Sequence, residues 1–402
     1  MSIFRRWGVE PIINASGAVT RLGGAPMPDE VLEAFREAAA DSAPLEQLQA
    51  AASREIARWT GAEAGLVTSG AAAALTLGTA AILARFDLGR MERLPDCAGF
   101  PHEFVVAREQ RNGYDHAVRA AGARLVEAGY HELVAGAGVR RCEAWELAAA
   151  IGPSTAGVLY VHDARARPPL RDEVLAAHER GVPVLVDAAG ELPPRNNLRD
   201  ILESGADLVA FSGGKAIRGP QATGLLCGRR DLIASAALQM LDMDDHFDLW
   251  SPPADWIDKR RLPGLPRHGL GRAMKVSKEQ IVALLTALER FGSGAYDALV
   301  ARELACLQAI ASMLVGHPAA TTRILDPADG QSSPTLEVTL DASRLGRSAW
   351  DVCRALRAGA PPVYVGHGRL DEGVLVVHPL HLNDERTRQL TQRLLDELSP
   401  RR

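Results

Sequence analysis

Short apolar runs alternate with alanine- and leucine-rich stretches of helical length between about residues 60 and 230. This alternation predicts repeated strand and helix units. Most of the apolar runs lack polar residues at every second position, which is typical of parallel strands covered by helices on both faces. We therefore predict an α/β fold with a mostly parallel, seven-stranded sheet sandwiched by helices. The predicted strands are Gly65–Thr68, Phe104–Ala107, Arg124–Glu127, Gly157–Val161, Val182–Val186, Leu208–Phe211 and Leu225–Cys227.

The pattern changes between about residues 242 and 268, where four prolines lie among tryptophans and charged residues. Proline interrupts regular helices, so this segment is predicted to be an irregular passage into a second domain. A helical pattern begins behind it at Ser277. We predict a large domain over 51–265 and a smaller α+β domain over 266–402, which an N-terminal segment over 1–50 joins. The strand-like stretches TLEVTLD and GVLVVHP belong to the smaller domain.

Composition limits the partners and the compartment. The 402 residues are 47% hydrophobic and 24% charged, as in an ordinary folded protein, and the formal net charge of −5 offers no basic excess to nucleic acid. The five cysteines form no CxxC pair, so no metal site is predicted. The sequence has no signal-peptide core and no apolar stretch of about 18 residues. These features predict a soluble cytoplasmic protein without a membrane partner.

Two of the predicted strand ends carry groups of opposite charge. Asp187 follows the strand Val182–Val186, and Lys215 follows the strand Leu208–Phe211. Ligands of parallel sheets bind beyond the carboxyl ends of the strands, so both side chains can face one crevice. They can form a plain ion pair. They can also form a catalytic pyridoxal phosphate site, in which the lysine carries the cofactor as a Schiff base and the aspartate pairs with the protonated ring nitrogen.

The strand Gly65–Thr68 leads directly into small residues and then a helix. The unpaired amide groups of a helix that starts at Ser69, Gly70 and Ala71 can hold a phosphate, and Ser212 is expected to assist. Ordinary helix capping would leave the same pattern. Combined with the lysine and the aspartate, this stretch is predicted to be the phosphate cup of the cofactor.

Two glycines precede the lysine and raise the question of a nucleotide site. Gly213 and Gly214 are expected to let the backbone approach the cofactor closely. A P-loop would need glycine at the position of Val209 and serine or threonine at that of Ala216, so this interpretation fails. A GxGxxG motif does not follow the first strand either, which leaves a dinucleotide fold without support.

Six stretches of the chain resemble the selenocysteine synthase-like family of fold-type I pyridoxal phosphate enzymes, which includes ammonia lyases of amino sugar acids. They extend over roughly residues 10–290, and FSGGKAIRGPQATG is the most specific of them; the others are INASGAVTRLGG, LVTSGAAAAL, RNGYDHAVRAAGARLVEAG, VDAAGELPP and GRAMKVSKEQIVALLTALE. The resemblance implies that Lys215 holds the cofactor and Asp187 contacts its ring nitrogen. It places Ser69, Gly70 and Ser212 near the phosphate.

The resemblance also implies contacts around the ring. His162 ends the strand before Asp187, where such enzymes place a cofactor or substrate contact, although a capping or core histidine fits the position equally. Gln110 and Arg111 occupy the region that covers the ring face, and the sequence does not decide between them.

Four residues of the matching motifs are candidates for binding an anionic substrate or the phosphate of a neighbouring subunit's cofactor: Arg218, Gln221, Arg272 and Lys275. Each of them alone would also suit an ordinary surface position. The resemblance implies sites shared across a homodimer or a larger homo-oligomer.

The chain departs from the family pattern in two places. The INASG motif starts near Ile13 instead of following an extra N-terminal domain, and the net charge is negative, so a tRNA substrate is not expected. GVLVVHPLHL contains His378 and His381 but no arginine for a substrate carboxylate, which argues against ordinary transamination.

The resulting hypothesis is a lyase that performs α,β-elimination on a small amino acid or amino sugar acid and releases ammonia and a 2-oxo acid, with Lys215 as the base. A racemase or an aldolase would begin from the same covalent complex, and the sequence does not decide which bond breaks. A non-catalytic protein that keeps the fold is the remaining alternative.

Overall fold

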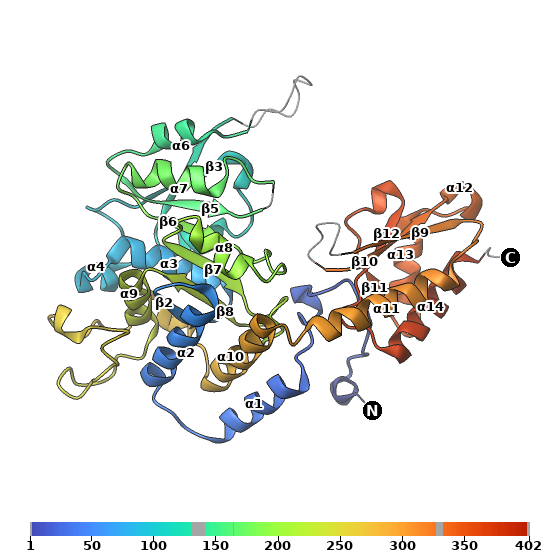
Figure 1. Cartoon of the computed structure of the whole chain (residues 1–402), viewed down its shortest axis with the longest axis horizontal. Helices are drawn as coiled ribbons and strands as arrows, with labels where there is room; N and C mark the ends of the chain where they lie inside the picture. Colours follow the sequence, from blue (N-terminus) through green and yellow to red (C-terminus); the bar gives the residue numbers. More distant parts are fainter. Residues whose placement is uncertain (1, 131–140, 164, 327–332, 400–402) are drawn as a thin grey trace. The chain divides into compact units, whose positions relative to one another are not determined.

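A computed structural model describes residues 2–130, 141–163, 165–326 and 333–399 (Figure 1). The chain forms two compact units. The larger unit is Met27–Gly292, and the smaller unit combines Met1–Pro26 with Ser293–Arg402.

The larger unit is built on the predicted seven-stranded sheet, with the strands in the order β2-β8-β7-β6-β5-β3-β4. Strand β8 runs antiparallel to both of its neighbours, and the remaining pairs are parallel. All seven predicted strands are present, which confirms the predicted fold class. Their bounds are β2 (Ala64–Thr68), β3 (Glu103–Ala107), β4 (Arg124–Ala128), β5 (Thr155–Val161), β6 (Val184–Asp187), β7 (Leu208–Ser212) and β8 (Gly224–Gly228).

Ten α-helices accompany the sheet among the described residues of this unit. They are α1 (Asp29–Ala40), α2 (Leu45–Thr60), α3 (Ala71–Ala84), α4 (Leu88–Arg93), α5 (Asp115–Ala120), α6 (Ala144–Ala150), α7 (Leu170–His178), α8 (Asn197–Glu203), α9 (Arg230–Met240) and α10 (Lys278–Ser293). Short 3₁₀ turns are η3 (Arg108–Gln110), η4 (Lys259–Arg261) and η5 (Leu270–Met274).

Helices cover both faces of the sheet (Figure 1). Gly65 of β2 lies against Ile56 of α2. The next residue, Leu66, pairs with Leu226 of β8, and Leu226 lies against Gly78 of α3. Because neighbouring residues of a strand point to opposite faces, α2 and α3 lie on opposite faces of the sheet.

Helix α3 is the central helix of this core. Each of its residues from Ala73 to Ala84 is buried, as expected for a helix that is apolar on all sides. It packs on strands β5 to β8 and on α9. This packing fixes the start of α3 at the carboxyl end of the sheet, where ligands of such folds bind.

The smaller unit is an α+β structure. Parallel strands β1 (Ile13–Ala15) and β11 (Val363–Val365) form one sheet, and β9 (Ala320–Leu325), β10 (Thr335–Leu340) and β12 (Val374–Val377) form an antiparallel one. Both predicted strands of this unit, β10 and β12, are present. The other elements are α11 (Asp297–Met313), α12 (Ala342–Leu345), α13 (Ala349–Ala358), α14 (Asp384–Leu398), η1 (Ile3–Trp7), η2 (Thr20–Leu22) and η7 (Leu370–Glu372).

The observed boundaries of the larger unit, Met27 and Gly292, differ from the predicted boundaries at residues 50 and 265. The ammonium of Lys278 in α10 donates to the carbonyl oxygens of Ala38, at 2.8 Å, and of Ala39, at 3.1 Å, in α1. Leu284 of the same helix packs against Gly213 and Gly219 behind β7. Helices α1 and α10 therefore belong to the larger unit. The proline-rich passage, in which the only regular element is η4, lies within that unit and does not lead into the smaller one.

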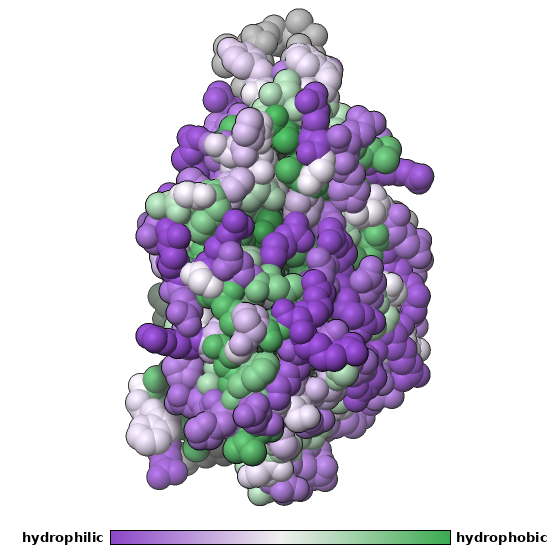
Figure 2. All heavy atoms as spheres, turned by 90° about the vertical axis from the view of Figure 1, so that its left-hand side faces the viewer, coloured by the Kyte–Doolittle hydropathy of each residue, from purple (hydrophilic) through white to green (hydrophobic). Residues whose placement is uncertain are grey.

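Polar side chains dominate the face in Figure 2, with hydrophobic side chains in patches between them. Among the described residues, no helix combines the length and the apolar character needed to cross a bilayer. All five cysteines are free and buried.

Candidate active site

Lys215 and Asp187 come from neighbouring parallel strands of the larger unit. Asp187 is the last residue of β6, pairs with Ala210 of β7, and has only 7% of its surface exposed. Lys215 lies three residues beyond the end of β7. Its Nζ atom lies at the turn after β6, where a Cβ added to Gly190 would be 4.0 Å away. The structure therefore brings the predicted pair together at one edge of the sheet.

The pKa of Asp187 responds to opposing influences. Burial raises the pKa of this carboxyl group, while the N–H of Ala189, 3.0 Å from Oδ1, and the Lys215 ammonium lower it. The nearby Glu191 carboxylate raises it further. A buried carboxylate stays ionised most readily beside a cation, and a protonated pyridine nitrogen would be such a cation.

The residues predicted to bind the phosphate lie at the start of α3. Gly70 precedes the helix with a φ of 104°, and no side chain caps the helix. A Cβ added to Gly224 of β8 would lie 2.5 Å from the carbonyl carbon of Gly70, so the two backbones are in direct contact. Gly224 pairs with Thr68 on one side and with Ser212 on the other. Ser212 therefore lies beside the start of α3, as predicted.

The hydroxyl groups near this helix start are used elsewhere as donors. Ser69 Oγ donates to the carbonyl oxygen of Met274 at 2.9 Å, and Thr68 Oγ1 donates to that of Gly70 at 2.9 Å. The first backbone hydrogen bond of the helix is donated by Ala74 to Gly70. The amide groups of the first turn, which begins at Ala71, are therefore available to an anion, and the helix dipole favours negative charge there.

Gln110 and His162 lie at the ends of β3 and β5. Gln110 is buried, and its Oε1 accepts a hydrogen bond from the N–H of Val161 at 2.9 Å. The backbone N–H of His162 donates to the carbonyl oxygen of Asp187 at 2.9 Å, and its Nδ1 lies 3.4 Å from Oε2 of Glu191. His162 thus joins the end of β5 to the end of β6 at Asp187 and to Glu191 in the turn that follows.

Arg111, the other candidate for the ring face, is already paired. Its Nε donates to Asp115 at 2.6 Å, and its guanidinium also contacts the Glu127 carboxylate. Of the two candidates, Gln110 is the one that lies beside His162.

These residues fit pyridoxal phosphate. An aldehyde needs an amine, a pyridinium nitrogen needs a carboxylate, and a phosphate needs open amide groups. Lys215, Asp187 and the uncapped start of α3 supply these groups at neighbouring strand ends of one sheet.

The two glycines before Lys215 lie in close contact with the segment before β8. A Cβ on Gly213 would lie 2.4 Å from Oγ1 of Thr223, and a Cβ on Gly214 would lie 2.5 Å from Cα of Gln221. The absence of side chains therefore lets the lysine loop pack against the segment before β8. The close approach of the backbone to the cofactor at these glycines stays a prediction.

Comparison with known proteins decides the family. A family model described as SelA, L-seryl-tRNA selenium transferase, matches residues 116–243. A D-glucosaminate-6-phosphate ammonia lyase of Salmonella typhimurium (strain 14028s / SGSC 2262) is 30% identical over 386 residues, which are 94% of this chain and 93% of the relative. The chain belongs to the selenocysteine synthase-like family of fold-type I pyridoxal phosphate enzymes.

Two further matches support this assignment. A 5'-C-glycyluridine monooxygenase-decarboxylase of Streptomyces sp is 31% identical over 401 residues, which are 97% of this chain and 90% of the relative. The solved structure of a D-glucosaminate-6-phosphate ammonia-lyase has a TM-score of 0.82 and 28% identity, and the match covers 99% of this chain and 98% of that chain. The predicted family and the predicted class of pyridoxal phosphate enzyme, shared with these ammonia lyases, are confirmed.

The four predicted anion-binding residues of this selenocysteine synthase-like enzyme fall into two groups. Arg218 and Gln221 belong to the loop between β7 and β8; Arg218 is buried and has a positive φ of 61°, which is unusual for arginine. Arg272 and Lys275 belong to η5 and the segment after it, next to the Met274 carbonyl that Ser69 contacts. Their roles stay predictions.

Arg272 and Lys275 line a cavity of about 450 Å³ together with Ser277 and Gln280. Arg272 donates to Oδ2 of Asp242 at 2.7 Å, while Lys275 is exposed. Lys275 is therefore the better placed of the two for an anion from outside this chain.

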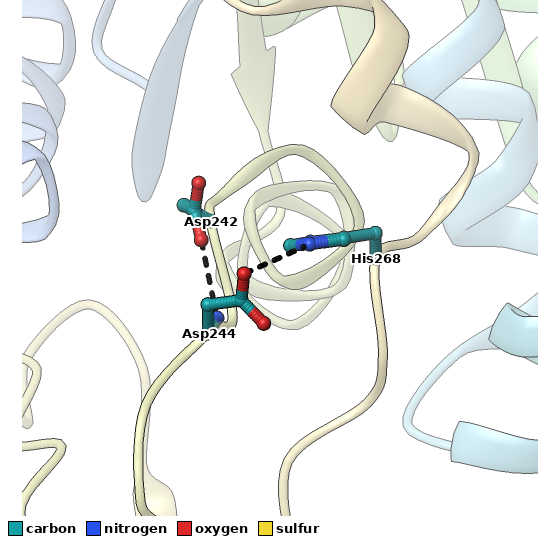
Figure 3. A group of neighbouring side chains, drawn as sticks. All are labelled: Asp242, Asp244 and His268. Atoms are coloured by element: carbon teal, nitrogen blue, oxygen red, sulfur yellow. Dashed lines mark hydrogen bonds and ion pairs between the residues drawn. The ribbon is translucent and has the colours of Figure 1, made fainter.

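Asp242, Asp244 and His268 form an exposed group of side chains that the sequence analysis missed (Figure 3). Asp242 accepts a hydrogen bond from the N–H of Asp244 at 3.1 Å, and Asp244 lies 3.6 Å from Nε2 of His268. The Asp244 N–H and the Arg272 guanidinium lower the pKa of Asp242, which burial raises slightly. Asp242 thus also orients Arg272, and all three side chains of this group are exposed.

The two C-terminal histidines hold the INASG motif within the smaller unit. The backbone N–H of His378 donates to Ala15 at 2.9 Å, and its ring lies against Gly17. Burial lowers the pKa of this imidazole, so His378 is neutral at neutral pH. His381 Nε2 lies 2.8 Å from the carbonyl oxygen of Gly24.

Two acidic residues near the site were not predicted from the sequence. Glu191 approaches both His162 and Asp187, and Glu109 directly precedes Gln110. Glu191 stands within the VDAAGELPP motif, four residues after the predicted catalytic aspartate, so its position in that turn was the signal that could have identified it.

Proposed function

We propose that this protein is a pyridoxal phosphate-dependent lyase that performs α,β-elimination on a small amino acid or amino sugar acid. The observation that carries the proposal is the placement of Lys215 Nζ at the turn that follows the buried Asp187. Two relatives named as ammonia lyases, one matched in sequence and one in structure, support elimination as the reaction.

When bound, pyridoxal phosphate supplies an electron-accepting ring that stabilises negative charge at the substrate's α carbon. Lys215 would hold the cofactor and then take the proton from the α carbon at its Nζ. Asp187 would keep the ring nitrogen protonated, and the amide groups of Gly70 and Ala71 would bind the phosphate. Ser69 and Ser212 flank this phosphate position.

The proposed elimination balances in atoms and electrons. The α proton moves to Nζ of Lys215, the bond from the β carbon to its hydroxyl oxygen breaks, and water leaves with that proton. A second water then hydrolyses the carbon–nitrogen bond, which releases ammonia and a 2-oxo acid. No external oxidant or reductant is consumed.

A second candidate reaction is oxidative decarboxylation, which the monooxygenase-decarboxylase relative favours. It would break the bond to the carboxylate and consume oxygen. Racemisation and aldol cleavage use the same lysine and break other bonds. Separate assays of ammonia, 2-oxo acid, carbon dioxide, aldehyde and oxygen uptake distinguish these reactions, and aldehyde or carbon dioxide without ammonia would reject elimination.

The proposal includes the assembly and its location. The protein is a homodimer, or a larger homo-oligomer, that works in the cytoplasm on a small molecule and not on nucleic acid. The net charge of −5 supports a small-molecule substrate instead of nucleic acid. The family resemblance supports the homo-oligomer.

The test is covalent attachment of the cofactor at Lys215. The purified protein should be yellow, and borohydride should remove the visible absorbance and leave the cofactor mass on the peptide that contains Lys215. Lys215→Arg keeps the charge but should lose both the attachment and about a thousandfold or more of the activity.

Lys259→Arg is the matched control, because Lys259 donates to the carbonyl oxygen of Trp250, outside the site. It should keep the colour and the activity. Attachment at another lysine, or a colourless and active protein, would reject the proposed function.

A further inference from the structure

Two arginines of the smaller unit meet at one aromatic ring. Val363 and Val365 of β11 are buried, so Tyr364 between them points to the opposite face of the strand, where it is half-buried. The guanidinium carbon of Arg21 lies 5.5 Å from the centre of the Tyr364 ring, and that of Arg357 lies 5.2 Å from it. The fold thus brings together two cations that are far apart in the sequence.

Three segments of the smaller unit position these side chains. Arg21 belongs to η2, which follows the INASG stretch, and this stretch contains β1, the partner of β11. Arg357 lies in the last turn of α13, a helix that packs on β11 (Figure 1). His367 lies two residues beyond β11, and its Nδ1 is 3.3 Å from Nη2 of Arg357. Arg21, Arg357, Tyr364 and His367 form the Tyr364 cluster.

Neither arginine of the Tyr364 cluster has a carboxylate partner in the part of the chain that the structure describes. Carboxylates are not scarce in this unit, because eight of its other arginines form ion pairs: Arg5, Arg302, Arg344, Arg347, Arg354, Arg369, Arg388 and Arg393. The face of the ring attracts both guanidinium groups but does not neutralise their charge. An anion that contacts both groups would neutralise it.

The free polar groups of the Tyr364 cluster are donors. A guanidinium can only donate, so Nδ1 of His367 accepts from Arg357, and the proton of the neutral imidazole is on Nε2. This Nε2 and the Tyr364 hydroxyl group have no hydrogen-bond partner among the described residues. Arg21 and His367 are exposed, so a ligand from solvent can reach the cluster. Donors without an acceptor favour a ligand that only accepts, as carboxylates and phosphates do.

We propose that the Tyr364 cluster binds an oxyanion, which is a carboxylate or a phosphate. The two guanidinium groups supply the charge and the paired N–H groups that fit the geometry of such an anion. Nε2 of His367 and the hydroxyl group of Tyr364 donate to its remaining oxygen atoms. The cluster shares no residue with the lysine site, and the proposal does not depend on the reaction at Lys215.

Calorimetric titration of the purified full-length protein with malonate and with malonamide tests this site. The two probes have nearly the same shape, but only malonate is charged. Malonate should bind saturably, with one molecule for each chain, and at least about tenfold more tightly than malonamide. Inorganic phosphate should compete with malonate. Equal affinities of the two probes, or no saturable binding of malonate and phosphate, would overturn the proposal.

Exchanges within the Tyr364 cluster locate the binding. Arg21→Gln and Arg357→Gln each remove one guanidinium group, so each should weaken malonate binding by about tenfold. Arg357→Lys keeps the charge but loses the paired N–H groups, so its affinity should lie between those of Arg357→Gln and the unmodified protein. Tyr364→Phe keeps the ring and removes the hydroxyl group, which should weaken binding by about threefold.

Arg354→Gln is the matched control, since Arg354 is an exposed arginine of the same helix that already pairs with Asp351 at 2.9 Å. It should leave the affinity for malonate unchanged. Circular dichroism confirms that each variant folds. An affinity that survives both Arg21→Gln and Arg357→Gln, or that the control loses to the same extent, would overturn the assignment of the anion to the Tyr364 cluster.

The anion can be part of the substrate or a separate ligand, and steady-state kinetics distinguishes these sources. If it is part of the substrate, malonate inhibits competitively, and Arg357→Gln raises KM while kcat stays nearly unchanged. If it is a separate ligand, excess substrate does not reverse the effect of malonate on the rate. A protein without a lysine-bound cofactor would contradict the proposed function, whereas calorimetry still decides whether the Tyr364 cluster binds the anion.

Discussion

At the scale of single residues, the chemistry of the site depends on how burial and charge act on individual side chains. Burial raises the pKa of the Asp187 carboxyl group, and the N–H of Ala189 and the Lys215 ammonium oppose this shift. Glu173 of α7 lacks such partners: it is fully buried, and neither carboxyl oxygen has a hydrogen-bond partner in the described part of the chain. Burial, together with the nearby Glu109 carboxylate, raises the pKa of Glu173 well above its usual value.

This residue gives a signed pH prediction. The folded state keeps a proton on Glu173 that the unfolded state releases above its ordinary pKa, so stability falls as the pH rises toward the raised value. Glu173→Gln removes this dependence. As the pH rises from 5 to 8, the melting temperature of this variant should increase relative to that of the unmodified protein. The increase should be about 2–4 °C for each kcal/mol of lost destabilisation.

Thermal unfolding at several pH values checks this expectation, with the exposed Glu179→Gln as the control that shows no such gain. Parallel melting curves of the Glu173→Gln variant and the unmodified protein across this range would contradict the raised pKa.

At the scale of elements, the loop from β7 to β8 positions the lysine. Gly213 donates its N–H to Thr223 at 2.9 Å and accepts from Gly219 at 2.9 Å, which closes the loop on itself. Leu284 of α10 packs against this loop, so α10 supports the lysine without contributing a polar group.

Gly214→Ala tests this arrangement. The added Cβ would lie 2.5 Å from Cα of Gln221, and a backbone atom cannot move aside easily. We expect a loss of about 1–3 kcal/mol in the free energy of unfolding. Because Lys215 is the next residue, the fraction of protein that carries the cofactor should also fall.

Denaturant unfolding and visible absorbance measure the two effects. Gly152→Ala is the matched control, since a Cβ there meets no atom within 4 Å. If Gly214→Ala has the same free energy of unfolding and the same cofactor absorbance as Gly152→Ala, the loop does not need glycine at position 214.

At the scale of the whole molecule, the larger unit contains every residue predicted to bind the cofactor, and Lys275 is exposed at the edge of the 450 Å³ cavity. The family resemblance implies an anionic substrate or a neighbouring subunit's cofactor phosphate as the partner of this residue, and the second of these is tested here. This arrangement would make a single subunit incomplete.

Mixed dimers test this shared site. Lys215→Arg and Lys275→Ala should each be impaired as homodimers, because the cofactor lacks its lysine in one and its phosphate contact in the other. When the two are unfolded, mixed in equal amounts and refolded, half of the dimers contain one intact site. About a quarter of the unmodified activity should then return.

Sedimentation velocity verifies the dimer in the same samples. Activity equal to the average of the two variants would show that Lys275 acts within its own subunit or not at all. A monomer would reject the shared site directly.

Local patterns in the sequence were sufficient to predict the seven-stranded sheet and the pair of Lys215 and Asp187. Most of the seven strands are apolar runs that alternate with helical stretches, and the residues that follow parallel strands lie at the carboxyl edge of the sheet. Asp187, Lys215 and Gly70 therefore came together as the sequence predicted. The sequence analysis likewise predicted that a helix begins at Ser277, and there Ser277 and Gln280 exchange hydrogen bonds at the start of α10.

The sequence by itself determined the fold class, the strand ends and the lysine–aspartate pair, because each depends on residues close together in the chain or on the fixed direction of parallel strands. Only the tertiary structure decided the limits of the two units, the close contacts at Gly213 and Gly214, the pairing of Arg272 with Asp242, and the meeting of Arg21 and Arg357 at Tyr364. These features depend on contacts between residues far apart in the chain, and no local pattern records which distant side chain will fill or leave open a given position.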